Sequence, residues 1–430
     1  MAPIIRTRLN VLVAAYACNP RYGSEEGVGW EWVNLIAKDH DVTVITAAFH
    51  RNDIEQITHG WSRVRFVYVP HRKWHYSPTR AWTAIESSLL KPIMNLAYAR
   101  WQTDAFRLAR DLTRGAHFDL VHQVTYVGYR FPGRLWRLGM PFVWGPVGGL
   151  ENTQWNLLPA MGFYGAIYYG GRNLVNLAQR RWLRSPQRAA RAAGRGLIAA
   201  TGAIAKDLKS LYGADSTVLS EVTAPIALSP ASPRRRAPDE PLQLVWTGQH
   251  LPGKALNIVL QALARVRPEV NWRLDVLGDG PLYWRWRELA DSVHVGACCQ
   301  WHGMLPRAEA LAVMSRGHVL TISSLKDLTS TVLLEGLALG LAVICPDHCG
   351  FSDVVTEECG IKIPPRTIED LIIGFAAAIE SMALDEPRRY RMAEQALRRA
   401  QDYSSERKRE QLNRIYEKVI CNYHDAKEVG

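Results

Sequence analysis

Two series of short apolar runs, each alternating with helix-like segments, constrain the fold of this chain more than any other feature. In the first series we expect strands over residues 10–16, 41–47, 63–70, 118–124 and 141–147, and helices over 26–39 and 79–114. Parallel strands that are covered on both faces read as apolar runs of this kind, and helices connect them. The first series therefore predicts a doubly wound α/β domain.

A second series follows a break in the pattern. Residues 225–241 contain five Pro, three consecutive Arg and no hydrophobic period, which is typical of a linker. Ligands of doubly wound sheets bind at the carboxyl ends of the strands. Beyond the linker we expect strands over residues 242–248, 272–280, 293–299, 318–324 and 341–347, and helices over 253–266, 281–292 and 404–420. We therefore expect a first domain over residues 1–224, the linker, a second domain over 242–403 and a C-terminal helix over 404–430.

The composition is strongly basic, with a formal net charge of +11 over 430 residues. An excess of this size favours acidic partners, which include nucleic acid, anionic lipid and phosphorylated small molecules. Residues 171–200 hold seven Arg and no acid, soon after the aromatic stretch LPAMGFYGAIYYGG. This combination favours either an interfacial segment on an anionic membrane or a solvated basic helix that covers a core stripe. No recognised nucleic-acid module is visible, so we expect no nucleic-acid partner.

Cysteine usage and the N-terminus bear on the compartment. The seven Cys include no CxxC pair, which favours reduced thiols in a cytoplasm over a metal site or a disulfide framework. The start MAPIIRTRLNVLVAAYACNP resembles a signal peptide, but its apolar run VLVAAYA leads straight into a Gly-rich loop and a helical pattern. We expect a buried first strand there. No window reaches the roughly 18 consecutive apolar residues that a membrane span needs.

Two features of the first domain lie where a doubly wound fold places functional groups. Gly23, Gly27 and Gly29 follow the first strand and open a helix, where backbone N–H groups can approach a phosphate; a plain tight turn is the alternative. Their spacing is not GxGxxG, so a dinucleotide-dependent oxidoreductase is poorly supported. His122 ends a strand and is either a functional group or a hydrogen-bonded core residue.

The second domain opens with the segment TGQHLPGKALN. Gly248 turns the chain after the strand, and Lys254 lies near the start of the next helix, where the helix dipole disfavours a cation. An anion bound between the two would explain this position, and a solvated surface Lys is the alternative. The segment is not a P-loop, because the GxxxxGKS or GxxxxGKT pattern is absent. After the next strand, LGDGP contains Gly278 and one Asp rather than a DxD pair, so we expect no metal.

One carboxylate interrupts the most apolar stretch of the chain. Glu335 lies within residues 332–344, which are otherwise apolar or Gly, and Asp327 lies eight positions before it. A buried carboxylate is costly unless it is paired or hydrogen-bonded. On a helix, eight residues at about 100° each bring the two acids within about 80° of one direction, so both can face one site. The hydroxyls of residues 329–331 add a polar, anion-friendly cap at the helix start.

Together these segments resemble the retaining glycosyltransferases of family 4, also called glycosyl transferases group 1, which have the GT-B fold. SSLKDLTSTVLLEGLALGLAVI is similar to the family's stretch with two Glu separated by seven residues, and TGQHLPGKAL is similar to its "GR…KG" segment. The resemblance is strong over residues 242–365 and weaker in the first half, where YGSEEGVGWEW and FDLVHQVT carry it. It implies two Rossmann-like domains that face each other across a cleft, with the C-terminal helix packing back on the N-terminal domain.

The resemblance implies a role for each matching residue. Glu335 matches the Glu that holds the nucleotide ribose, and Lys254 matches the Lys that neutralises the diphosphate. Asp327 and His122 match residues near the transferred sugar, so the implied catalytic set is His122, Lys254 and Asp327. The rest of the implied donor-binding set is Gly23, Ser24, Gly248, Gln249, Gly278, Leu328, Thr329, Ser330 and Thr331.

The sequence departs from the family pattern at three points. Asp327 is one methylene shorter than the family's Glu, and LTS at residues 328–330 replaces Gly-Phe-Gly. Gln249 and His250 stand where an Arg is usual, which leaves one cation fewer for the diphosphate. These departures put the donor sugar and the catalytic efficiency in question more than the fold.

The resemblance implies a hexosyltransferase that needs no metal or other cofactor. It would move a sugar, with retained configuration, from a nucleoside-diphosphate sugar to a saccharide or lipid-linked acceptor through an oxocarbenium-like transition state. Its expected place is the cytoplasm, peripheral on the inner face of the cytoplasmic membrane, in bacterial cell-surface polysaccharide or glycolipid synthesis. Two alternatives stay open: a non-catalytic GT-B-like protein that binds nucleotide sugars, and another membrane-associated GT-B enzyme, such as an epimerase or a phosphorylase.

Overall fold

The computed structural model describes residues 8–70, 84–126 and 128–428. Residues 1–7 of the signal-like start and residues 79–83 of the first long expected helix lie outside this range. The chain forms two compact units: unit 1 comprises Met1–Glu151, Ala178–Glu221 and Lys408–Gly430, and unit 2 comprises Asn152–Leu177 and Val222–Arg407.

The division differs from the predicted domains in residues 152–177, 222–224 and 404–407, all of which fall in unit 2. Residues 152–177 were expected in the first domain, but they pack with unit 2. Asn257 Nδ2 donates a hydrogen bond to the Ala160 carbonyl at 3.0 Å, which ties this segment to the second half of the chain. The sequence could not predict this placement, because no local pattern shows which of two sheets a connecting helix will pack with.

Unit 1 is built on a parallel sheet of seven strands in the order β3-β2-β1-β4-β5-β6-β7. The apolar run in the signal-like start is the interior strand β1, which is buried and pairs with β2 and β4. The strands are β1 (Asn10–Ala15), β2 (Asp41–Ala47), β3 (Val64–Val69), β4 (Leu120–Thr125), β5 (Phe142–Val147), β6 (Leu197–Ala199) and β7 (Thr217–Val218).

Aromatic side chains and the last helix hold unit 1 together. The rings of Tyr16 and Trp101 lie 4.9 Å apart in the core. On α14, Arg409 pairs with Asp39 at 2.6 Å, so residues 408–428 pack within this unit. The helices of unit 1 are α1 (Ser24–Ala37), α2 (Arg51–Thr58), α3 (Ala84–Gly115), α5 (Arg184–Ala193) and α6 (Gly202–Tyr212), and two more, α4 (Gly162–Trp182) and α14 (Ser405–Glu428), belong partly to each unit.

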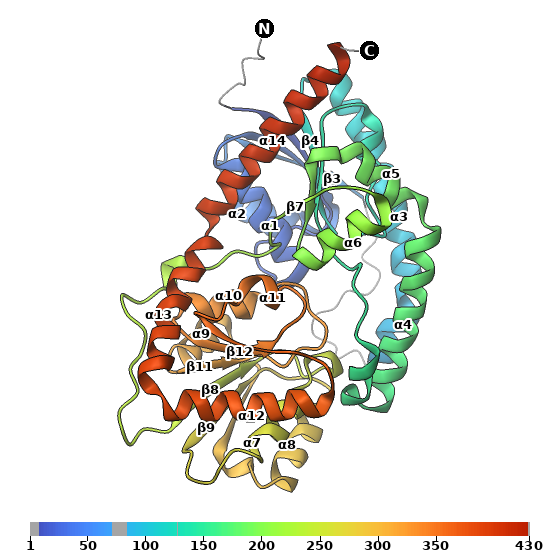
Figure 1. The fold of residues 1–430 in the computed structure, drawn as a ribbon. Coiled ribbons are helices and arrows are strands. Elements are labelled where there is room, and N and C mark those ends of the chain that lie inside the picture. Colours follow the sequence, from blue (N-terminus) through green and yellow to red (C-terminus); the bar gives the residue numbers. More distant parts are fainter. Residues whose placement is uncertain (1–7, 71–83, 127, 429–430) are drawn as a thin grey trace. The chain divides into compact units, whose positions relative to one another are not determined.

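Unit 2 contains a second parallel sheet, of six strands in the order β10-β9-β8-β11-β12-β13. Helices α7, α8 and α12 lie along one face of this sheet, and α9, α10 and α11 lie on the other (Figure 1). The strands are β8 (Leu242–Thr247), β9 (Trp272–Leu277), β10 (Cys299–Gly303), β11 (Val319–Thr321), β12 (Ala342–Pro346) and β13 (Gly360–Ile363). The helices are α7 (Leu256–Leu263), α8 (Tyr283–Ser292), α9 (Arg307–Met314), α10 (Thr331–Ala338), α11 (Phe351–Val354), α12 (Ile368–Leu384) and α13 (Glu386–Asp402).

The two parallel sheets confirm the predicted fold class, but one predicted strand is wrong. Residues 293–299 form a turn and a short 3-10 helix, and β10 begins only at Cys299. His294 has φ +60°, which a strand does not accommodate. The apolar letters VHV at its start reflect burial at the end of α8, where Val295 is buried.

The predicted linker is anchored rather than loose. Within unit 2, the Arg236 N–H donates to Glu386 Oε1 at 3.0 Å, and Arg389 Nη2 donates to the Arg234 carbonyl at 2.9 Å. Arg389 is fully buried and binds Glu386 through both Nε and Nη2, at 2.7 and 2.6 Å. The Arg run at residues 234–236 is therefore held against α13.

Candidate functional site

The carboxyl ends of β8 and β9 meet in two glycine loops. The Gly248 N–H, just after β8, donates to the Leu277 carbonyl at 3.1 Å. Gly278, just after β9, has φ +111°, and a Cβ there would lie 2.0 Å from the Gly248 carbonyl oxygen. Only glycine allows this conformation and this approach. The structure therefore places Gly248 and Gly278 of the predicted donor set side by side.

Lys254 and Asp327 form an ion pair. Lys254 Nζ lies 2.5 Å from Asp327 Oδ2, and both side chains are largely buried. Two hydrogen bonds bring their loops together: the Leu325 N–H donates to Gly253 O at 2.8 Å, and Ser323 Oγ donates to Lys254 O at 2.8 Å. Trp246 on β8 donates to that same Ser323 hydroxyl at 3.0 Å and so fixes its position. The two residues that the sequence suggested separately are therefore one charged pair.

The loop between Asp327 and α10 has a conformation that favours glycine. Ser330, the residue before α10, has φ +74°. The Leu328 N–H bonds Asp327 Oδ1 at 3.0 Å, and the Leu328 carbonyl accepts from the Gly350 N–H at 2.9 Å. Thr329 is buried. The backbone thus keeps a left-handed turn at the position where the family pattern has its second Gly, although the side chain is Ser.

Glu335 is buried on α10 and is paired with Arg307. Arg307 Nε and Nη2 donate to Glu335 Oε1 at 3.0 and 2.8 Å. The Glu335 side chain is only 9% exposed, whereas that of Arg307 is 67% exposed. Arg307 is the first residue of α9, where the helix dipole disfavours a cation. Sequence reasoning missed Arg307, although the argument that singled out Lys254 applies to it equally.

Gln249 and His250 differ in their exposure. Gln249 is exposed, whereas His250 is fully buried against the rings of Tyr283, Trp286 and Trp246, at 5.5, 5.1 and 5.5 Å. Burial lowers the pKa of His250 to about 4, so its imidazole is neutral at pH 7. Of the two residues at the position of the family's Arg, only Gln249 can reach a ligand.

His348 forms a hydrogen bond to the segment that leads to Asp327. Its Nε2 lies 2.9 Å from the Ser324 carbonyl oxygen, which can only accept, so Nε2 carries the proton. Its Nδ1 then accepts from the Cys349 thiol at 3.4 Å. Burial lowers the pKa of His348 to about 4. The sequence carried no signal for this residue.

In unit 1, His122 is a core residue on β4. Its Nε2 lies 2.9 Å from the Gly145 carbonyl oxygen and its Nδ1 lies 2.7 Å from the Tyr416 hydroxyl. Burial lowers its pKa to about 4. Both ring nitrogens are therefore engaged within the core, as in the hydrogen-bonded alternative that the sequence left open.

The Gly-rich loop of unit 1 owes two of its glycines to packing. A Cβ at Gly29 would lie 1.8 Å from the Ala17 carbonyl oxygen, and one at Gly27 would lie 2.8 Å from the Tyr22 carbonyl oxygen. Gly23 is exposed and has open space around it, and α1 begins at the next residue, Ser24. Gly23 is thus the one glycine of this loop that packing does not require.

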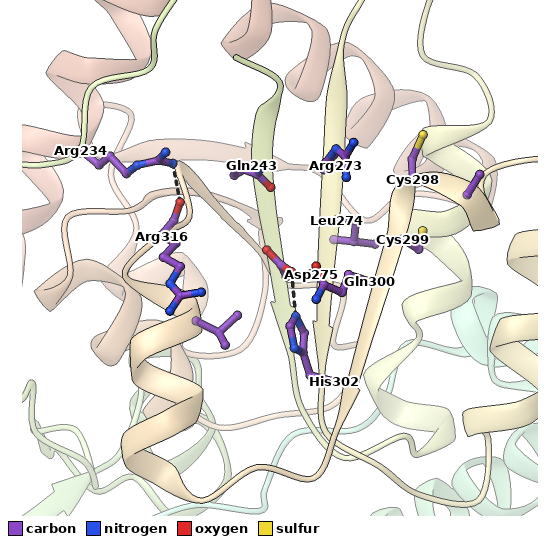
Figure 2. Close-up of a pocket in the computed structure, with 12 residues that line it drawn as sticks. Arg234, Gln243, Arg273, Leu274, Asp275, Cys298, Cys299, Gln300, His302 and Arg316 are labelled. Atoms are coloured by element: carbon purple, nitrogen blue, oxygen red, sulfur yellow. Dashed lines mark hydrogen bonds and ion pairs between the residues drawn. The ribbon is translucent and has the colours of Figure 1, made fainter.

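A separate pocket of about 360 Å³ lies on the β8–β9–β10 part of the unit 2 sheet (Figure 2). Its charged lining includes Arg234, Arg273, Arg316 and Asp275, and Asp275 Oδ1 is 2.8 Å from His302 Nε2. The pocket shares no residue with the predicted donor set. Within the described parts of the chain, no group of three or more His, Cys, Asp and Glu side chains is arranged to hold a metal ion.

Residues 231–399 match the family model described as glycosyl transferases group 1. The chain is 30% identical over 249 residues to the D-inositol 3-phosphate glycosyltransferase of Rhodococcus erythropolis (strain PR4 / NBRC 100887), which covers 54% of this chain and 55% of that protein. It is 22% identical over 174 residues to the phosphatidylinositol N-acetylglucosaminyltransferase GPI3 subunit of Saccharomyces cerevisiae (strain YJM789), which covers 40% of this chain and 38% of that protein. The chain thus spans about half the length, or less, of these curated relatives.

Solved structures resemble nearly the whole chain. Sucrose-phosphate synthase from Thermosynechococcus elongatus has a TM-score of 0.61 at 16% identity, with 96% of this chain and 100% of that chain covered. Anabaena HepE, solved in complex with UDP, has a TM-score of 0.57 at 12% identity, with 94% and 98% covered. WaaG, a glycosyltransferase involved in lipopolysaccharide biosynthesis, has a TM-score of 0.53 at 16% identity, with 91% and 95% covered. The two parallel-sheet units therefore have the GT-B fold, and within them residues 231–399 match the glycosyl transferases group 1 model.

Proposed function

We propose that this protein is a hexosyltransferase that moves a sugar from a nucleoside-diphosphate sugar to a saccharide or lipid-linked acceptor. The observation that carries the proposal is the presence of two cation–carboxylate pairs, Lys254–Asp327 and Arg307–Glu335, in loops and helices that follow strand ends of unit 2. Both pairs lie in the segment that matches the glycosyl transferases group 1 family. The UDP bound to HepE and the names of the curated relatives support a nucleotide-sugar donor.

In this proposal Glu335 accepts hydrogen bonds from the ribose hydroxyls of the donor. Sugar hydroxyls are donors, and an ionised carboxylate can accept about four hydrogen bonds. Arg307 donates to Oε1 of this carboxylate. Glu335 can therefore bind Arg307 and the ribose together, which accounts for an ionised acid in an apolar stretch.

Lys254 and the start of α10 stabilise the departing diphosphate in this proposal. When the donor binds, the Lys254 ammonium exchanges Asp327 for phosphate oxygens, and Asp327 is left near the transferred sugar. The N–H groups of the first turn of α10, which have no acceptor within the helix, add partial positive charge beside the phosphates. Charged groups and hydrogen-bond donors that are already positioned to stabilise the charge developing in the transition state are usually the largest source of rate enhancement in such sites.

The remaining details of the chemistry follow the family resemblance. We propose that the configuration of the sugar is retained, that the departing phosphate oxygen takes the acceptor's proton and that no metal takes part. Gly23, Ser24, Gly248, Gln249 and Gly278 stay in the proposed donor set. His122 is a positioning residue in this proposal, because both of its ring nitrogens are engaged in the core.

A thermal-shift screen with UDP, GDP, ADP, NAD and their common sugar conjugates tests the donor site. A ligand at about 100 times its Kd adds about 2.7 kcal/mol of stability, which is readily measured. We expect a shift with one class of nucleoside diphosphate, its loss in Glu335→Gln, and its retention in the matched control Glu309→Gln, which removes an exposed carboxylate from α9. A shift with NAD alone, or with none of these compounds, would contradict the proposal.

Turnover separates the proposal from the non-catalytic alternative. The change of Gly-Phe-Gly to Leu328-Thr329-Ser330 favours that alternative, since two glycines are lost at the donor loop. A transferase releases nucleoside diphosphate from the donor when an acceptor is present, and proton NMR of the product reports the anomeric configuration. A protein that binds the nucleotide sugar but releases nothing with any saccharide or lipid acceptor would be a binding protein.

We also propose the cytoplasm as the compartment, on the inner face of the cytoplasmic membrane, and bacterial cell-surface polysaccharide or glycolipid synthesis as the context. The basic composition, +11 over the chain, favours an anionic surface. The fold is shared with WaaG, which is involved in lipopolysaccharide biosynthesis. Fractionation of cells that express the protein tests the location, and recovery entirely in the soluble fraction at low salt would contradict it.

A further inference from the structure

Helix α4 carries large apolar side chains on its exposed side, although two of its buried positions are polar. Its buried positions are Gly165, Gly170, Asn173 and Asn176. Asn173 Nδ2 donates to the Thr153 carbonyl at 2.7 Å, and Asn173 Oδ1 accepts from the Thr153 N–H at 3.0 Å. A surface helix of a soluble protein normally turns its large apolar side chains toward the core.

The exposed side of α4 carries large apolar side chains. Phe163 and Tyr164 near its start are each 73% exposed, and Trp182 at its end is 76% exposed. Spacings of four and seven residues along the helix return to nearly the same side. An apolar surface of this length that no described residue covers marks an interaction site. We call it the α4 stripe: Phe163, Tyr164, Ile167, Leu174, Val175, Leu177 and Trp182.

Exposed cations accompany the stripe. Arg172 and Arg181 lie on α4, and Arg184, Arg188 and Arg191 follow on α5. In the part of the chain that the structure describes, none of these five guanidinium groups takes part in an ion pair. The whole of residues 171–200 contains no acid that could neutralise them. Apolar rings on α4, with unneutralised cations on the same helix and on the α5 segment that follows it in the chain, match a bilayer, which offers acyl chains directly beneath anionic headgroups.

The inner side of α4 packs on the loop that carries Lys254. A Cβ at Gly165 would lie 2.8 Å from Pro252 Cβ, and a Cβ at Gly253 would lie 2.7 Å from the Tyr169 hydroxyl. Both contacts lie within unit 2. The stripe is therefore the outer side of a helix whose inner side contacts the candidate donor loop directly.

We propose that the α4 stripe and its neighbouring arginines dock this protein on an anionic lipid bilayer and so hold the Lys254 loop next to the membrane surface. The apolar side chains enter the boundary between headgroups and acyl chains, and the arginines bind the headgroups. Docking is superficial, because within the described residues no helix is both long and apolar enough to cross a bilayer. Docking itself does not depend on the proposed function. Its consequence, that the acceptor is lipid-linked, does rest on the proposed transferase function.

Flotation of the full chain with vesicles tests the apolar part. Vesicles of phosphatidylglycerol and phosphatidylcholine are compared with vesicles of phosphatidylcholine alone, at low and high salt. We expect binding to the anionic vesicles and its loss in the triple variant Phe163→Ser/Ile167→Ser/Leu174→Ser. The matched control is Ile373→Ser/Leu384→Ser, which removes exposed apolar side chains from α12 and should bind as the unmodified protein does.

A charge series tests the arginines. Arg181→Gln, Arg184→Gln and Arg188→Gln should each weaken partitioning roughly fivefold, since a basic residue near an anionic surface contributes about that factor. The control pair Arg391→Gln/Arg398→Gln removes exposed charges from α13. Equal losses in both series would show a non-specific response to net charge and would overturn the proposal.

Three other outcomes would overturn it. These are no binding of the unmodified protein to anionic vesicles at low salt, undiminished binding of the folded triple Ser variant, or dimerisation through the stripe in sedimentation velocity. Circular dichroism and the nucleotide thermal shift are recorded for every variant. Vesicle binding without any nucleotide shift would leave docking intact and contradict the transferase proposal, and a nucleotide shift without vesicle binding would do the reverse.

Discussion

Acid should destabilise unit 2 through His250, and His250→Phe should remove the effect. His250 is fully buried, its ring stacks on Tyr283 at 5.5 Å, and within the described residues neither ring nitrogen has a hydrogen-bond partner. Its backbone fixes the loop that leads to Lys254, since its N–H donates to the Asp279 carbonyl at 2.9 Å. Desolvation by burial lowers its pKa from 6.5 to about 4, and the Asp279 carboxylate offsets this only in part.

The sign of the pH dependence follows from this lowered pKa. Below pH 6.5 the imidazole of the unfolded chain is protonated. In the folded chain it stays neutral until the pH falls to about 4. The stability is therefore fully present above pH 6.5 and is lost as the pH falls toward 4. Linkage over this interval gives a loss of about 2.5 kcal/mol at pH 4.5 relative to pH 7.5. His318 and His348 in unit 2 have pKa values lowered to about 4 and add losses in the same window.

Urea denaturation at pH 7.5 and pH 4.5, followed by tryptophan fluorescence, measures the effect. The free-energy difference between His250→Phe and the unmodified protein at pH 7.5 reports packing alone, because the imidazole is neutral in both states. We expect this difference to shift by about 2.5 kcal/mol in favour of the Phe variant at pH 4.5. A difference that is the same at both pH values would refute the reasoning, since it would mean that His250 takes up its proton in the folded state.

Three further perturbations follow from the site. Lys254→Met should lower kcat/KM for sugar transfer by about 100- to 1,000-fold, as loss of a transition-state charge partner does; a wild-type rate would contradict the role. Ser330→Gly should raise the unfolding free energy by about 0.5–1 kcal/mol, because the left-handed backbone there favours Gly, whereas the control Ser292→Gly at the end of α8 should not. Gly278→Ala should lower the melting temperature and nucleotide affinity together, because its Cβ would lie 2.0 Å from Gly248 O; unchanged values of both would show that the two loops separate freely.

Much of the fold could be predicted because a buried parallel strand appears in the sequence as a short run of consecutive apolar residues. Residues 41–47 were expected as a strand and form β2 with the same bounds. The strand predicted over residues 293–299 was wrong because a short apolar run at the end of a helix cannot be distinguished from a buried strand by its pattern alone. The very short strands β6 and β7 were not expected.

The sequence by itself determined the two parallel sheets and the positions at which loops meet their carboxyl ends, because both depend on residues that are near neighbours in the chain. It also marked Glu335 as an acid in need of a partner. Only the tertiary structure decided that the partner is Arg307, 28 residues away, and that Lys254 pairs with Asp327, 73 residues away. The structure likewise decided which side of α4 faces solvent. The sequence of a helix shows which residues share a side, but it does not show which side packs against the rest of the protein. Pairing and burial depend on how distant segments are packed together, and that information is not local.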